Sequence, residues 1–182
     1  MTLTDAQVER YSRQIVLPEV GGRGQERLLG ARVAVAGGGD VAAAVSDLLA
    51  RAGVGVVDVH EPIPDVIVDL SGDAVLGRRA QAMGRPVVLC TLAGTRVTVT
   101  TLVGRQCVTC LPAPEPTAAV SAGALAAPAV LALAALAASE ALRVLLLPPA
   151  SGRRTALDVA TGVASAAELA ATDGCTLCAG SA

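Results

Sequence analysis

The sequence predicts an α/β fold: a Rossmann-like, mainly parallel sheet flanked by helices, with an antiparallel extension and a tetracysteine zinc site. One observation is the stretch Val33–Ala50, in which a β-branched run enters three glycines and leaves into an Ala-rich amphipathic segment. A second is the series of short apolar runs separated by Gly and Pro, which is typical of buried strands. A third is a pair of CxxC motifs. We expect a single domain with N-terminal helices over 1–30, a βαβ core over 31–92 and a zinc-stapled C-terminal half over 93–182.

The glycine-rich turn is the most informative motif. Gly37, Gly39 and Ala42 satisfy the pattern GxGxxG/A. The first glycine permits a tight turn, the second lets a phosphate approach the backbone, and the small third residue lets the helix pack on the strand. The turn predicts a nucleotide-binding-like core, with Gly37 and Gly39 as cofactor-binding residues.

The other elements follow from periodicity and from helix signals. A capping box between Thr4 and Gln7 opens a helix that is expected to run through Ile15. Further helices are expected over 23–29, 40–52 and 72–83 and in a long Ala-rich segment that includes 118–139, and strands over 31–36, 55–60, 65–69, 86–91 and 96–103. Residues 155–158 and 163–169 predict either a hairpin or a strand and a short helix.

The connection between the second and third expected strands is unusually short. Parallel neighbours need a crossover of about a dozen residues or more, but only a short turn with Pro62 and Pro64 separates 55–60 from 65–69. The third strand must therefore pair antiparallel, lie elsewhere in the sheet, or follow a deletion.

Composition bounds the function. The 182 residues carry a net charge of −2, 16% charged residues and a single aromatic residue, Tyr11, so nucleic-acid binding by charge or base stacking is not expected. The N-terminus lacks a signal-peptide pattern, which predicts a cytoplasmic protein. The uncharged stretch Ala118–Ser139 is long enough to span a bilayer. Pro128 within it and the absence of flanking Lys/Arg clusters favour a buried core helix, and we expect no membrane insertion.

Four cysteines predict the zinc site. Cys107 and Cys110 form one CxxC motif, and Cys175 and Cys178 form the other. Four thiolates suit tetrahedral zinc and leave no open position for a catalytic water, so the predicted metal is structural. Two disulfides are the alternative interpretation. The fifth cysteine, Cys90, is interpreted as an inert core thiol, with a lone nucleophile as its alternative.

Six stretches together resemble the ThiF/MoeB/HesA family, which activates ubiquitin-like and sulfur-carrier proteins by adenylating their C-terminus. They occur in the family's order and span nearly the whole chain: RYSRQIVLPEVG (10–21), VAVAGGG (33–39), RAGVGVVDV (51–59), CVTCLP (107–112), SAGALAAPAV (121–130) into SEALRVLL (139–146), and GCTLC (174–178). The resemblance implies that Glu61 binds ribose and that Arg13 reaches the nucleotide of a neighbouring subunit. It further implies a homodimer, or a heterodimer with a full-length family member. His60 is interpreted as a surface residue.

Several departures from the family pattern put adenylation in doubt. The family's Arg- and Lys-containing segment that holds the triphosphate is replaced by Pro62–Pro64, and the sequence has no lysine. Asp40 stands where the family has glycine, and a carboxylate on the anion site would cost about 4 kcal/mol at 4 Å and an effective dielectric near 20. Gly72 takes the place of the magnesium-binding aspartate. No transfer cysteine precedes the long helix.

The sequence therefore predicts a shortened, non-adenylating family member that binds a protein partner, with Zn²⁺ as structural cofactor and no catalytic residue of its own except a trans-acting Arg13. The expected partner is a ubiquitin-like or sulfur-carrier protein, a leader peptide, or a second subunit. The alternative is an active adenylyltransferase that uses ATP and Mg²⁺ with Glu61 on the ribose and Arg78 or Arg79 near the phosphates. A dinucleotide-binding oxidoreductase is a third interpretation, since GxGxxA and Glu61 also fit that fingerprint.

Overall fold

The computed structural model describes residues 3–57, 64–72, 82–104, 111 and 123–169. Its centre is a sheet of seven strands in the order β2-β1-β3-β4-β5-β6-β7. The strands are β1 (Arg32–Ala36), β2 (Gly55–Val57), β3 (Val66–Asp69), β4 (Val87–Ala93), β5 (Arg96–Leu102), β6 (Gly152–Asp158) and β7 (Ala164–Leu169).

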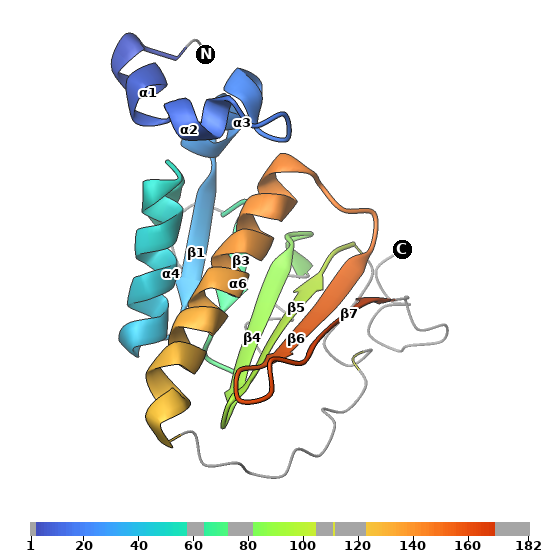
Figure 1. Ribbon diagram of the computed structural model, residues 1–182. Coiled ribbons are helices and arrows are strands. Elements are labelled where there is room, and N and C mark those ends of the chain that lie inside the picture. Colours follow the sequence, from blue (N-terminus) through green and yellow to red (C-terminus); the bar gives the residue numbers. More distant parts are fainter. Residues whose placement is uncertain (1–2, 58–63, 73–81, 105–110, 112–122, 170–182) are drawn as a thin grey trace.

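The first four strands run parallel and the last three are antiparallel additions (Figure 1). The predicted mainly parallel α/β sheet with an antiparallel extension is thus confirmed. Residues 152–158 and 164–169 form a hairpin, so the alternative of a strand and a short helix is wrong.

The third strand lies elsewhere in the sheet, on the far side of β1 from β2. Val33 pairs with Val56 of β2 on one side and with Val66 of β3 on the other, and both pairings are parallel. The antiparallel alternative for this strand is therefore wrong. Among the described strands β2, which has three residues, pairs only with β1 and is therefore an edge strand of the sheet.

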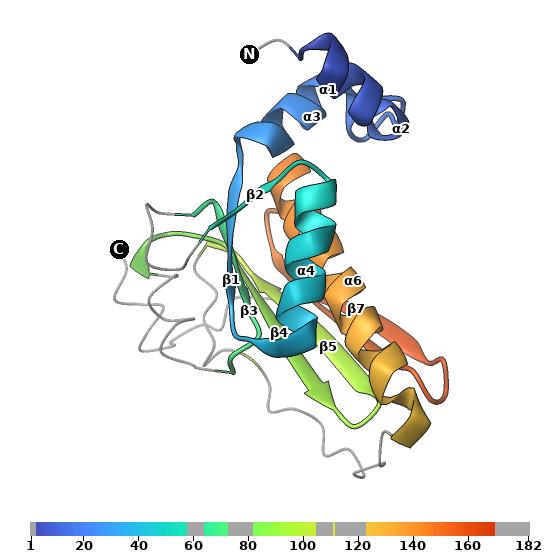
Figure 2. The same cartoon turned by 90° about the vertical axis from the view of Figure 1, so that its left-hand side faces the viewer.

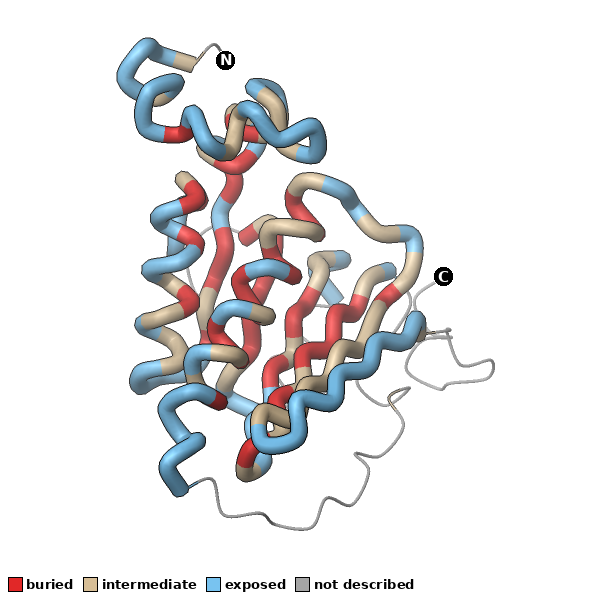
Figure 3. Tube along the Cα trace, in the orientation of Figure 1, coloured by how far each residue is buried: buried red, intermediate tan, exposed pale blue. Residues whose placement is uncertain are grey.

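Two helices cover one face of the sheet: α4 (Gly39–Arg51) and α6 (Ala126–Leu146), which pack against each other (Figures 1 and 2). The principal core lies between these helices and the strands, where Val, Leu and Ala side chains are buried (Figure 3). Both helices run antiparallel to the parallel strands (Figure 1), so the end of α6 lies beside the start of these strands.

The long Ala-rich helix begins later than residue 118. A 3-10 turn, Gly123–Leu125, leads into α6 at Ala126, and residues 112–122 are outside the described part of the chain. Pro128 therefore lies in the first helical turn, where its missing N–H has no intrahelical partner to lose. By length and composition Gly123–Leu146 could cross a membrane, with a mean hydropathy of 1.9, but this signal is weak because core helices share it. Its buried face packs on β3, β4 and β5, as expected for a core helix.

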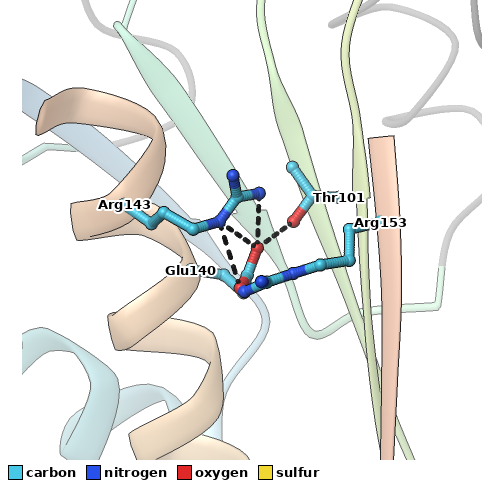
Figure 4. Close-up of polar contacts among 4 residues, drawn as sticks. All are labelled: Thr101, Glu140, Arg143 and Arg153. Atoms are coloured by element: carbon cyan, nitrogen blue, oxygen red, sulfur yellow. Dashed lines mark hydrogen bonds and ion pairs between the residues drawn. The ribbon is translucent and has the colours of Figure 1, made fainter. Parts of the chain in front are cut away.

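A buried carboxylate fastens α6 to the antiparallel strands (Figure 4). Glu140 is 4% exposed. Its Oε2 accepts hydrogen bonds from Thr101 Oγ1 of β5 at 2.8 Å and from Arg143 Nη2 at 2.9 Å, and Arg153 of β6 pairs with Oε1. The two guanidinium groups offset the cost of burying this charge.

The N-terminal segment forms three helices: α1 (Asp5–Arg10), α2 (Ser12–Ile15) and α3 (Gly21–Gly30). The predicted Thr4–Gln7 capping box is confirmed. The single helix expected through Ile15 is interrupted at Tyr11, whose φ and ψ of −103° and 15° are not helical. Tyr11 is the only buried side chain among described residues 3–17. It lies against Gly53, where a β-carbon would come within 3.0 Å of its ring.

Candidate functional site

The glycine turn joins the carboxyl end of β1 to the start of α4, and its glycines have different roles. Gly37 has φ +118°, and a β-carbon there would lie 2.9 Å from Leu70 Cβ. Gly39 also has a positive φ, +76°, but no atom of the described residues lies within 4 Å of its β-carbon position. Gly37 is required for packing against the chain after β3, whereas Gly39 keeps space open above the helix terminus.

The backbone N–H groups at the start of α4 have no capping side chain and can donate hydrogen bonds to an anion. The N-cap is Gly38, which has no side chain to accept from the first-turn N–H groups. Asp40 lies in this first turn, is exposed, and makes no hydrogen bond with the described residues. The expectation that its carboxylate occupies the helix N–H groups is wrong, because the side chain is turned to solvent. In a water-like dielectric its repulsion of an anion at 4 Å falls to about 1 kcal/mol.

A second loop follows β3 beside the turn, since Leu70 N donates to Ala36 O at 2.8 Å. Asp69 at the end of β3 is 2% exposed. Its Oδ1 accepts hydrogen bonds from Ser71 N at 2.8 Å and Ser71 Oγ at 2.6 Å. This carboxylate oxygen is therefore held within its own loop. Gly72, with φ +69°, follows and contributes no side chain for a metal ion.

Cys90 lies on β4 within the core and is 5% exposed. Burial, with a smaller contribution from the charge of Asp69, raises the pKa of its thiol to about 12. Its Sγ donates to Val88 O at 3.6 Å. A thiol with this pKa carries almost no thiolate near neutral pH, in agreement with the interpretation as an inert core cysteine.

The structure brings Gly37, Gly39 and Asp69 together but places Arg13 elsewhere. Arg13 is exposed on α2, which packs on α3 at the amino end of β1, whereas the glycine turn is at the carboxyl end (Figure 2). Arg13 could therefore meet a glycine turn only in another subunit, and its role in trans stays a prediction. The predicted ribose ligand, the alternative phosphate ligands, the four zinc ligands and most of the helix over 72–83 lie outside the described residues: Glu61, His60, Arg78, Arg79, Cys107, Cys110, Cys175 and Cys178.

Sequence reasoning did not foresee the contact between Leu70 and Gly37 or the hydrogen bonds between Ser71 and Asp69. The signal for the second was present, because a Ser two residues after an Asp is typical of an Asx turn. The contact with Leu70 depends on the pairing of β1 with β3, which the local sequence does not specify.

A glycine turn at the carboxyl end of the first parallel strand, followed by a helix with an open N-terminus, defines a domain of the Rossmann-like class. Residues 11–61, which contain this turn, match the ThiF family. This segment of the chain is therefore similar to the ThiF family.

Curated relatives match over about a third of the chain. The sulfur carrier protein adenylyltransferase of Thermus thermophilus is 48% identical over 61 residues, 34% of this chain and 22% of that protein. The SAMP-activating enzyme E1 of Haloferax volcanii is 42% identical over 71 residues, 39% of this chain and 25% of that enzyme. The matched segment thus spans about a quarter of each relative.

Solved structures share the whole fold at low identity. E. coli MccB with MccA-N7isoASN superposes with a TM-score of 0.70 at 13% identity, covering 96% of this chain and 75% of MccB. PaaA gives a TM-score of 0.68 at 14% identity, covering 92% of this chain and 75% of PaaA. At these identities the likeness establishes the fold alone.

Proposed function

We propose that this chain is a non-adenylating member of the ThiF family that binds a carrier protein or a leader peptide. The Thermus thermophilus relative acts on a sulfur carrier protein by name, the Haloferax volcanii relative activates SAMP, and MccB has been solved with MccA. A peptide or the extended tail of a small protein is therefore the partner class that fits this fold best.

The observation that carries the proposal is the charge of the candidate site. Asp40 and Asp69 flank the glycine turn, and the described loops at the ends of β1 and β3, residues 37–39 and 70–72, contain no cation. A triphosphate needs positive charge as well as helix N–H groups. The described part of the site supplies the helix N–H groups but no positive charge.

The N-terminal arm, defined as residues 5–17, supports a partner-binding role. Val8, Val16 and Leu17 on this arm are 45%, 76% and 47% exposed. Tyr11 is the one buried side chain of the arm, and it lies against Gly53. We propose that the arm lies against a second subunit, either another copy of this chain or a full-length family member, which Arg13 would then reach.

Calorimetric titration with ATP and magnesium, paired with ATP–pyrophosphate exchange in the presence of a candidate carrier, tests the proposal. We expect at most millimolar affinity for ATP and no exchange, while the arm-dependent complex still forms. Val16→Asp is the matched variant for the arm, because it should break the complex and leave nucleotide affinity unchanged. Micromolar ATP affinity with exchange would overturn the proposal.

The open N-terminus of α4 favours a second candidate, an active adenylyltransferase. Gly39 leaves space for a phosphate, and the exposed Asp40 repels it only weakly. In this case Arg78 or Arg79 would hold the phosphates and Glu61 the ribose. Exchange that is lost in an Arg78→Gln, Arg79→Gln double variant but kept in an Arg51→Gln control would establish this function.

We also propose that Cys107, Cys110, Cys175 and Cys178 hold one structural Zn²⁺ in a cytoplasmic protein. The support is the spacing of the two CxxC motifs. Metal analysis of reduced protein should give about one equivalent of zinc, and chelation should lower the melting temperature. Less than half an equivalent, or melting that does not respond to chelation, would contradict this site.

A further inference from the structure

A cavity of about 670 Å³ lies at the end of the sheet opposite the glycine turn. It forms where the last turns of α3 and α6 meet the residues that precede β3 and β4 and follow β5. This volume is within the range of small-molecule sites, about 300–1,000 Å³. Adenylation does not require a pocket at this end of the sheet, so a role in adenylation does not explain the cavity.

The walls of the cavity are mainly apolar. Pro86 and Pro149 are half-buried and Pro148 is exposed, so the prolines supply most of the accessible apolar surface. Val144 and Leu145, 5% and 8% exposed, line the cavity as well. Proline and β-branched side chains lose little freedom when a ligand contacts them. The apolar part of a ligand would therefore bind here at low entropic cost.

Two of the charged residues that line the cavity are already engaged. Arg27 Nη1 donates to Leu146 O at 2.8 Å and so caps the end of α6. Asp65 Oδ2 accepts from Arg32 N at 2.9 Å, and Asp65 N donates to Arg32 O at 2.8 Å. These contacts hold α3, α6 and β1 in place and make the cavity a preformed space.

The other two charged residues have opposite sign and retain capacity for a ligand. Glu26 is half-buried and has no hydrogen bond or ion pair with the described residues. Arg85 Nη1 is 3.9 Å from Asp65 Oδ1, beyond hydrogen-bond distance, and the described part of the chain offers it no other polar partner. A half-buried charge without a hydrogen bond is costly, and a ligand of complementary charge relieves that cost.

The position of the two charges suggests how a ligand would lie. Arg27 already offsets the negative C-terminus of α6, so the neighbouring Glu26 carboxylate is left as the uncompensated negative charge on α3. Arg85 precedes β4 on the other side, and guanidinium groups bind carboxylates with paired hydrogen bonds. A ligand with an ammonium group for Glu26 and a carboxylate for Arg85 is a zwitterion.

We propose that this cavity binds an apolar zwitterion of the amino-acid class, with its carboxylate on Arg85, its ammonium on Glu26 and its side chain against Pro86, Pro149 and Leu145. The ligand is either a free apolar amino acid or a short apolar peptide. This site is independent of nucleotide binding at the glycine turn.

Calorimetric titration of the full chain with L-leucine tests the proposal. We expect saturable binding at one site, weakened about tenfold by Arg85→Gln and about tenfold by Glu26→Gln, as one charge-assisted contact is lost in each. Arg51→Gln is the matched control, since Arg51 pairs with Asp47 on the surface outside the cavity, and it should bind like the wild type. Circular dichroism of each variant separates lost binding from lost folding.

Ligand analogues keep the test decisive even where a variant is less stable. L-leucinamide lacks the carboxylate, so its affinity should be the same for wild type and Arg85→Gln. N-acetyl-L-leucine lacks the ammonium, so its affinity should be the same for wild type and Glu26→Gln. Tighter binding of L-leucyl-L-leucine than of L-leucine assigns the ligand to peptides, the reverse assigns it to free amino acids, and either result supports the site. No saturable binding up to about 10 mM L-leucine, or binding that neither variant weakens, would overturn the proposal.

Discussion

The two ends of the parallel strands differ in charge and in what shapes them. At the carboxyl end, backbone geometry dominates: glycines at positive φ, an open helix N-terminus and the carboxylates Asp40 and Asp69. At the amino end, side-chain pairing dominates, and every arginine described between Gly21 and Pro86 lies there: Arg23, Arg27, Arg32, Arg51 and Arg85. In an α/β sheet ligands usually bind at the carboxyl end. Here the arginines described between Gly21 and Pro86 are at the other end, so the shape of a nucleotide site is separated from these charges.

The largest effect should come from Gly37→Ala at the carboxyl end. A left-handed φ and a β-carbon 2.9 Å from Leu70 Cβ should together cost about 3 kcal/mol in the free energy of unfolding. Gly39→Ala has the strained φ without the contact and should cost about 1 kcal/mol. Urea denaturation measures both. Equal losses would mean that the contact with Leu70 does not define the turn.

Glu140→Ala tests the side-chain pairing near the amino end. Loss of the carboxylate leaves Arg143 and Arg153 unpaired beside the core, but these side chains are 25% and 38% exposed and can turn to water. We expect a loss of about 2 kcal/mol in the free energy of unfolding. Asp47→Ala, which breaks an exposed pair with Arg51 on α4, is the control and should cost about 0.5 kcal/mol or less. A loss no greater than that of the control would show that the cluster does not fasten α6.

Cys90 gives a pH-dependent test near Asp69. Its pKa is raised from 9.0 to about 12 in the folded chain, so above pH 9 the unfolded chain ionises first. The stabilising contribution is complete below the unfolded pKa and is lost as the pH rises toward the folded one. Between about pH 8 and about pH 10 wild type should lose about 1 kcal/mol more than Cys90→Ala. Parallel stability curves for the two proteins would contradict the burial of a neutral thiol.

The smallest effect concerns the exposed Asp40. Asp40→Asn should tighten ATP binding at low salt by about fivefold, the value of about 1 kcal/mol for a solvent-screened charge. Asp47→Asn lies on the same helix near its other end and should leave ATP affinity unchanged. A gain of about a thousandfold would place the carboxylate on the anion site itself, against the geometry described above.

The sequence was sufficient for the features that depend on local chemistry. The capping box, the glycine turn, the strands and the helix on the sheet follow from residue type and periodicity, and the structure has them. It was insufficient where partners are distant in the chain. The position of β3 beyond β1, the contact of Leu70 with Gly37 and the exposure of Asp40 depend on pairing and packing that no local pattern encodes. The amino-end cavity is the same case, because it is assembled from five separate stretches.

The single tyrosine gives this molecule an unusual spectroscopic property. The sequence contains no tryptophan and no phenylalanine, so Tyr11 is its sole aromatic fluorophore. Its ring is buried where the N-terminal arm meets Gly53 and Gln25, with the guanidinium of Arg10 5.6 Å from the ring centre. Tyrosine fluorescence of the unlabelled protein therefore reports only on the contact between the N-terminal arm and the rest of the fold. A change in its intensity or anisotropy when a partner is added would show that the arm has moved or become more rigid, without an introduced dye.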